Sequence, residues 1–278
     1  MCSPSTRADL IYLFANVFVY GSILAWAIVS SAVLAGSVAG GLTAVFGRAG
    51  PATLPEVAVR SLVTVTLFLA YELGYWIDHY LSHRLPILWE FHKVHHSANV
   101  LTPLTVWRVH PIDSLVFYNI LAIVIGLANG VVVYAVGAGR ESYMIAGNNL
   151  LLVVFIHAYI HLQHSQLWIA FRGLAGRIFM SPAHHQIHHS MNPRHFNSNF
   201  GASLAVWDWL FRTLQIPARE PERLTFGVAA DGHDPNAIAE LSIAPVIRAV
   251  ALLKAKVAEQ LAGLMKEQPS RRAREANP

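Results

Sequence analysis

Apolar and polar stretches alternate along the first part of the chain in a way that predicts membrane-spanning helices. Four apolar runs stand out, at residues 10–42, 57–77, 115–136 and 142–162. A helix needs about 20 apolar residues to cross the hydrocarbon core of a bilayer, and each run is long enough. The first run exceeds one crossing, so we expect that helix to be tilted or to bend near Gly36, Gly40 and Gly41.

The segments outside these runs are more polar. Residues 84–112 contain three prolines and should form short helices and loops. No further run of spanning length follows Gln166. Between Ala244 and Lys266, apolar residues recur at helical spacing, which predicts an amphipathic helix that lies on the bilayer or packs on the rest of the protein. Residues 268–278 are polar and basic, and we expect them to be disordered.

The predicted fold is therefore an all-α integral membrane protein with three regions. Residues 1–77 would form an N-terminal membrane anchor of two spans. Residues 78–213 would form a helical cap and would include a transmembrane hairpin at about 115–162. Residues 214–278 would hold the amphipathic helix and the basic tail.

The composition agrees with a membrane protein and narrows the chemistry. Only 13% of the residues are charged, against about 25% in a soluble domain, and 54% are hydrophobic. The single cysteine, Cys2, excludes an internal disulfide and any zinc site built from two or more thiolates. A net charge of +4 gives no reason to expect nucleic acid as a partner.

The distribution of positive charge predicts the orientation in the membrane. With four spans, residues 1–9, 78–114 and 163–278 share one side, and that side carries 17 of the 20 Lys and Arg residues. Cytoplasmic segments are richer in Lys and Arg than external ones. We therefore expect the cap to lie on the cytoplasmic side.

The histidines are the candidate functional residues of this chain. Most of its 15 histidines fall in runs whose spacing of three or four residues places imidazoles on one face of a helix. Four such segments supply ten candidate ligands: His79, His83, His92, His95, His96, His157, His161, His185, His188 and His189. A metal ion takes about four to six ligands, so ten suit two metals. Imidazole binds Zn, Cu, Fe and Ni, so the spacing alone does not identify the metal.

Other polar residues near these runs are candidates for supporting roles. We expect His110, His164, His184 and His195 to contact substrate, to join the ligands or to hydrogen-bond the scaffold. Metal-bound histidines usually donate their second ring N–H to a polar partner. The candidates for that role are Asp78, Asp113, Asn197, Asn199 and Asp208. Glu72 would either support His79 or pair with a neighbouring helix, and His233 reads as an ordinary loop histidine.

Two other classes of membrane protein also use histidines. A metal transporter would place its ligands along the middle of the spans, whereas here they lie at span ends and in the cap. A haem-binding electron carrier would need two axial histidines per haem and would leave the tight His-x2-His-His runs unused.

The motifs around the histidines resemble one known family. They are Asp78-His79-x3-His83-Arg84-x-Pro86-x-Leu88-Trp89-x-Phe91-His92-x2-His95-His96-Ser97, Arg108-x-His110-Pro111-x-Asp113, Ser181-Pro182-x2-His185-x2-His188-His189-Ser190, Asn197-x-Asn199-Phe200-Gly201 and Trp207-Asp208-x-Leu210-Phe211-x-Thr213. In order and spacing they resemble the fatty acid hydroxylase / sterol desaturase superfamily of integral-membrane di-iron enzymes. The resemblance covers about residues 74–213.

The resemblance implies an activity and its cofactors. It implies that the ten histidines hold two iron ions, for which zinc can substitute in preparations, and that 78–213 is the catalytic region. With O2 as co-substrate, such an enzyme hydroxylates an unactivated C–H bond of a lipid, or desaturates it in a close variant. The lipid could be a fatty acyl chain, an aminolipid, a sterol-like ring or a carotenoid.

The electrons for such a reaction must come from another protein. The chain has no Gly-rich dinucleotide fingerprint after a strand and no cysteine set for an iron–sulfur cluster. We therefore expect a separate donor of ferredoxin or cytochrome type, with its reductase.

Overall fold

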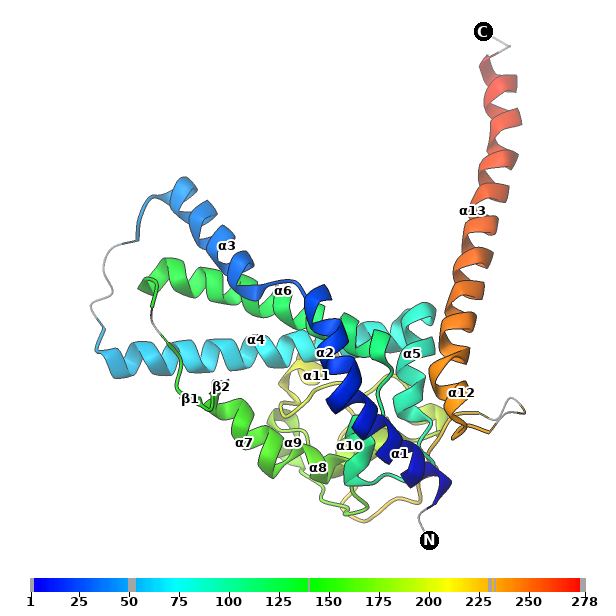
Figure 1. Cartoon of the computed structure of the whole chain (residues 1–278), viewed down its shortest axis with the longest axis horizontal. Coiled ribbons are helices and arrows are strands. Elements are labelled where there is room, and N and C mark those ends of the chain that lie inside the picture. The colour runs from blue at the N-terminus through cyan, green and yellow to red at the C-terminus, as the bar shows by residue number, and fades with distance from the viewer. Residues whose placement is uncertain (1–2, 50–53, 140, 230–231, 233, 276–278) are drawn as a thin grey trace.

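The fold is mostly helical, as predicted (Figure 1). It was obtained as a computed structural model that describes residues 3–49, 54–139, 141–229, 232 and 234–275. His233 and residues 276–278 of the predicted tail therefore lie outside the described residues. The two strands, β1 (Met144–Ile145) and β2 (Asn148–Asn149), form one short antiparallel pair in which Met144 faces Asn149.

Within the described residues, three helical segments are long and apolar enough to cross a membrane. They are Pro4–Phe46, which is interrupted, and the continuous helices α4 (Glu56–Arg84) and α6 (Pro111–Val136). Figure 1 shows α4 and α6 running side by side with α3 (Ser31–Phe46) along α6. The apolar ends of α4 and α6 meet in a small core of Val59, Val63 and Val132.

The fourth predicted span, 142–162, is not one continuous helix. It begins with the β1–β2 hairpin and continues as α7 (Leu150–Ala158) and α8 (Ile160–Gln163). The turn uses Ala146 and Gly147 at positive φ, and the Asn149 side chain caps α7 by accepting from the Leu151 N–H. These two helices are shorter than the predicted span, because the first residues of the run form the turn and its cap.

The N-terminal apolar run bends at a different place from the one predicted. It forms α1 (Pro4–Ala15), a π-helix η1 (Asn16–Tyr20), α2 (Gly21–Leu24) and a 3-10 turn η2 (Ala25–Ala27) before α3 begins. The prediction of a bend near Gly36, Gly40 and Gly41 was wrong, since α3 runs through all three. The break lies just before α3. There the Ser30 side chain caps the first turn of α3, and the Asn119 side chain accepts a hydrogen bond from Val29 N and donates one to Ala27 O.

The first helix, α1, packs against the cap. The Asp9 carboxylate forms a fully buried ion pair with Arg108, 3.3 Å between Oδ1 and Nη1, and accepts hydrogen bonds from Thr102 and Thr105. The Tyr12 hydroxyl lies 3.0 Å from that of Ser242. A buried charge is tolerated only when it is paired and hydrogen-bonded, and this network meets that condition.

The cap consists of short helices, several of which begin with proline at the first turn. These are α5 (Pro86–His96), η3 (Pro103–Trp107), α9 (Gly173–Ile178), α10 (Pro182–His188), η4 (Pro193–His195), α11 (Val206–Phe211) and α12 (Ile238–Ser242).

The last helix, α13 (Ala244–Glu275), packs on α5 near its start and then extends away from the body in Figure 1. Residues 251–262 of α13 are exposed. The helix also includes residues 268–275, which were expected to be disordered. Their Arg, Ala, Gln and Glu residues favour a helix, whereas Pro269 in the same stretch disfavours one.

Candidate metal centre

The cap gathers nine histidines from four places in the chain. His79 and His83 lie near the C-terminal end of α4, and His92, His95 and His96 end α5. His185, His188 and His189 end α10, and His164 follows α8. Each histidine offers one ring nitrogen as a possible ligand atom. These nitrogens form two separate groups, and within each group they all lie within 4.8 Å of one another.

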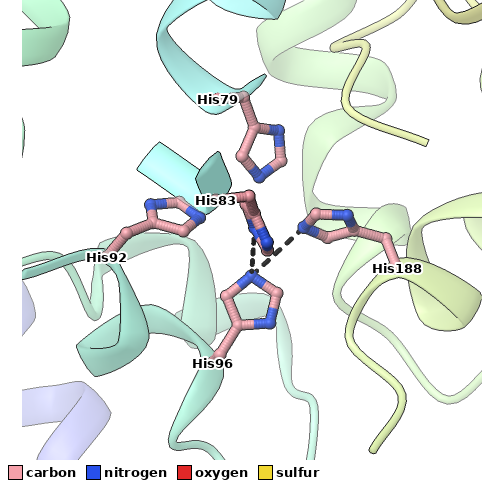
Figure 2. Close-up of side chains that lie close together, drawn as sticks. All are labelled: His79, His83, His92, His96 and His188. Atoms are coloured by element: carbon pink, nitrogen blue, oxygen red, sulfur yellow. Dashed lines mark hydrogen bonds between the residues drawn. The ribbon is translucent and has the colours of Figure 1, made fainter. Parts of the chain in front are cut away.

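The first group contains five histidines (Figure 2). They are His79, His83, His92, His96 and His188. The Nε2 atom of His96 lies 3.2 Å from that of His83 and 3.1 Å from that of His188. The Nε2 atoms of His79 and His92 are buried and have no hydrogen-bond partner among the described residues. Figure 2 shows the five rings pointing toward one shared centre.

The second group contains four buried histidines, His95, His164, His185 and His189. The Nε2 atom of His164 lies 3.1 Å from that of His95 and 3.0 Å from that of His185. The Nε2 atom of His189 lies 3.1 Å from that of His185. Members of both groups alternate along α5 and α10, so the two centres are adjacent.

In three rings of the first group, a hydrogen bond at Nδ1 determines which ring nitrogen carries the proton. His79 Nδ1 lies 2.8 Å from the Phe200 carbonyl, and His188 Nδ1 lies 2.8 Å from the Ser198 carbonyl. His92 Nδ1 lies 3.1 Å from Oδ2 of Asp113. A carbonyl only accepts, so Nδ1 of His79 and of His188 carries the proton, and the Nε2 lone pair faces the shared centre. The Asp113 carboxylate favours the same tautomer of His92.

Burial keeps the histidines of α10, the last two of α5 and His164 neutral. It lowers the pKa of His188 to about 3 and that of His164 to about 4. Burial, followed by repulsion from neighbouring imidazoles, lowers the pKa of His95, His96, His185 and His189 well below the ordinary value. A metal binds the neutral imidazole. Inward-facing ring nitrogens that lie 3.0–3.2 Å from one another, or that have no partner as in His79 and His92, are therefore a donor set that fits two metal ions.

Two buried carboxylates hold the loop that carries the Ser198 and Phe200 carbonyls. Asp208 accepts hydrogen bonds from Phe200 N at 2.8 Å, Gly201 N at 2.7 Å and Trp76 Nε1 at 3.2 Å. Burial raises the pKa of the Asp208 carboxyl, while these donors favour its charged form. Glu72 on α4 accepts from the N–H groups of Ser203 and Leu204. Both carboxylates therefore help to fix the loop whose carbonyls face His79 and His188.

The other predicted supporting residues stabilise the fold around the groups. His184 lies 2.6 Å from the Ser181 hydroxyl at the start of α10, and burial lowers its pKa to about 4. His110 caps α6 and contacts the Ser242 carbonyl, while His195 lies 3.6 Å from Glu222. Asn197 and Asn199 adopt positive φ. The Asn199 amide donates to the carbonyls of His184 and Gln215.

Two of the ten predicted ligands lie outside both groups. His157 is exposed and its Nδ1 lies 2.9 Å from the Val153 carbonyl of its own helix. His161 Nδ1 lies 3.4 Å from the Pro103 carbonyl. The helix breaks at Tyr159, where φ is −132°, so the expected i, i+4 alignment of the pair is lost. His164, which follows the break, occupies the second group instead.

Two pockets reach the histidine groups from different sides. A membrane-side pocket of about 380 Å³ touches His79, His92, His95 and His164. Its walls include residues of the candidate spans and of α7 and α8, among them Leu24, Ile28, Tyr75, Phe117, Ile156 and Ile160. A cap-side pocket of about 550 Å³ touches His83, His96, His188 and His189, and its walls include Trp89, Lys93, Leu241 and Arg248.

Comparison with known proteins connects this geometry to a family. A model of the fatty acid hydroxylase family matches residues 64–213, more than half of the chain. The chain belongs to the fatty acid hydroxylase family. All nine gathered histidines lie inside the matched region, and the resemblance seen in the sequence motifs is confirmed.

Relatives in the family include several lipid-modifying enzymes. An alkylglycerol monooxygenase of Danio rerio is 30% identical over 164 residues, which cover 58% of this chain and 32% of that protein. The ornithine lipid hydroxylase OlsE of Rhizobium tropici is 28% identical over 158 residues, 56% of this chain and 43% of the relative. Human cholesterol 25-hydroxylase is 25% identical over 182 residues, 61% of this chain and 60% of the relative. This chain thus matches less than two thirds of each relative, and no solved structure matches it.

Proposed function

We propose that the chain is a membrane-bound, O2-dependent lipid hydroxylase in which each histidine group holds one iron ion. The observation that carries the proposal is the pair of buried groups of neutral imidazoles beside a pocket walled by membrane-spanning segments. The three named relatives support hydroxylation, since each acts on a lipid and is called a monooxygenase or hydroxylase. Desaturation on the same site is the alternative.

The ligand assignment follows the two groups. His79, His83, His92, His96 and His188 would hold one ion, and His95, His164, His185 and His189 would hold the other. His157 and His161 are not included. Iron suits the reaction because it is a redox metal, and zinc would bind the same nitrogens in some preparations.

The protein's own residues prepare the site in three ways. The Ser198 and Phe200 carbonyls keep the Nδ1 proton of His188 and His79 in place, which frees Nε2 for the metal. Burial excludes water and keeps the rings neutral. The bound metals would supply the oxidation of an unactivated C–H bond, which side-chain acid–base chemistry cannot achieve. The largely apolar membrane-side pocket would hold the lipid against the ions.

The rest of the proposal concerns topology and electrons. The 142–162 segment would complete a fourth crossing, so that the cap and both termini lie on one side. The excess of Lys and Arg supports a cytoplasmic position for that side. A separate donor of ferredoxin or cytochrome type would supply electrons. The histidines lie at the cap ends of the helices, which favours an enzyme over a membrane metal transporter.

Lipid analysis of expressing cells grown under 18O2 tests the activity. We expect lipids with one added 18O atom in cells that express the wild type, and none in cells that express His188→Ala at the same membrane level. His157→Ala is the matched control, and it should retain the product because His157 is exposed and outside both groups. Labelled product from His188→Ala, or none from the wild type supplied with a reductase system, would contradict the proposal.

A further inference from the structure

Asp78 is a buried carboxyl group without a visible role in the metal centre. It precedes His79 on α4 and is 5% exposed. Its Oδ1 atom is buried, and no described residue donates a hydrogen bond to it. A buried carboxyl oxygen without a donor is destabilising, so its presence needs an explanation.

Asp78 lines the membrane-side pocket together with Asp113. The two carboxyl groups differ, because Oδ2 of Asp113 is engaged by His92 while Oδ1 of Asp78 is unpaired. None of the described residues that line this pocket is Lys or Arg. The pocket therefore offers a hydrogen-bond acceptor beside the histidines and no protein cation to satisfy it.

The rest of the wall is suited to a lipid chain. Leu24 and Ile28 come from the N-terminal segment, Phe117 from α6, and Ile156 and Ile160 from α7 and α8. The pocket thus combines an apolar wall with one unpaired acceptor next to His79. A ligand that matches this wall has a hydrocarbon chain and a hydrogen-bond donor at one end.

We propose that Asp78 binds the donor group, a hydroxyl or an ammonium, at the polar end of the lipid substrate. The proposal rests on the lipid hydroxylase function above and narrows its substrate class. Because Asp78 and the ligand His79 line the same pocket, the carbon that is oxidised lies near the polar end of the lipid. Lipids with a free hydroxyl or amine are then substrates, and pure hydrocarbons such as carotenes are not.

Binding of three lipids to zinc-loaded protein in phosphatidylcholine nanodiscs tests this without turnover. The probes share one chain length: hexadecylamine, a hexadecyl glycerol ether with free hydroxyls, and hexadecyl methyl ether, which has no donor. Apparent Kd values come from titrations of thermal stability, since a ligand that binds the folded state raises it. We expect at least one donor-bearing lipid to bind about tenfold or more tightly than the methyl ether, as suits a hydrogen bond to a buried acceptor that otherwise has no partner.

Variants identify the residue and the donor. Asp78→Leu should abolish the preference for a donor, and Glu259→Gln, a change at an exposed carboxylate on α13, should leave it intact. Asp78→Asn keeps an acceptor oxygen at the same position, so it should retain the preference for the glycerol ether over the methyl ether. The wild-type comparison needs no variant, so it remains decisive even where Asp78→Leu does not fold.

The outcomes separate this inference from the proposed function. Equal binding of all three lipids to the wild type, or a donor preference that survives in folded Asp78→Leu, would overturn the role of Asp78 and leave the hydroxylase proposal standing. Failure of the wild type to bind any of the three lipids would overturn both.

Discussion

At the scale of residues, the metal centre depends on which nitrogen of each imidazole is free. The doubled His-x2-His-His runs predicted six of the nine gathered histidines because a helix presents such residues on one face. His79 and His83 followed from the same rule. His164 was named only among the supporting candidates, because nothing in the local sequence predicts the break at Tyr159 that turns His157 and His161 away.

His164 and His157 make a direct test of the ligand assignment. His164→Ala should lower the metal content from two ions to one per chain, because it removes one of the four imidazoles of the second group. His157→Ala should keep both ions. Elemental analysis of the two purified variants measures this, and a loss of metal from His157→Ala with none from His164→Ala would restore the assignment made from sequence.

Asp208 should influence metal affinity without touching the metal. Asp208→Asn places an amide group opposite the N–H donors of Phe200 and Gly201, which loosens the loop that holds His79 and His188. We expect zinc affinity at the first group to fall about 10- to 100-fold, as for other residues that orient metal ligands. Competition with a chelator measures this. The exposed Asp234→Asn serves as control, and equal affinities in the two variants would exclude the role of Asp208.

At the scale of elements, the sequence predicted the spans in α4 and α6 and short helices between residues 84 and 112, but not how the helices meet. α3 lies along α6 because Gly126 and Gly130 allow close approach: a Cβ at Gly126 would lie 2.9 Å from the Ser31 carbonyl oxygen. A spacing of four residues between small side chains is typical of packed membrane helices. The bend before α3 depends on Asn119, more than 80 residues away in sequence, which local patterns cannot reveal.

A matched pair of glycine substitutions tests this packing. Gly130→Ala should destabilise the protein, because the added Cβ would lie 2.5 Å from Val38 Cβ and 2.9 Å from the Ala35 carbonyl oxygen. Gly41→Ala meets nothing within 4 Å and should be neutral or slightly stabilising, since alanine favours a helix. Thermal unfolding in detergent measures both. An equal effect of the two substitutions would show that α3 does not pack on α6 as described.

At the scale of the whole molecule, both histidine groups lie in the cap, beside the C-terminal end of the candidate span α4. Composition and the four apolar runs predicted a multi-pass protein, and three helical segments of spanning length agree. The sequence could not show that α1 packs on the cap, because that contact depends on the buried Asp9–Arg108 pair between distant segments. The same packing keeps the N-terminal helix beside the cap that holds the histidines.

Cysteine labelling tests the proposed orientation. In a Cys2→Ser background, Glu259→Cys on α13 should react with an impermeant maleimide from the cytoplasmic side, because α13 extends from the cap. Ala138→Cys, in the exposed turn after α6, should react from the opposite side. Labelling of both cysteines from the same side would contradict the proposal that one membrane crossing separates residue 138 from α13.

The central claim, that two histidine groups hold two redox metals, is tested most directly by counting metal in the wild-type protein. Iron and zinc should be measured separately per chain on protein purified without chelators. The account predicts a total of two ions per chain, one for each group, and iron in the preparations that oxidise lipid. Folded, monodisperse protein that holds no metal after incubation with iron or zinc would contradict it.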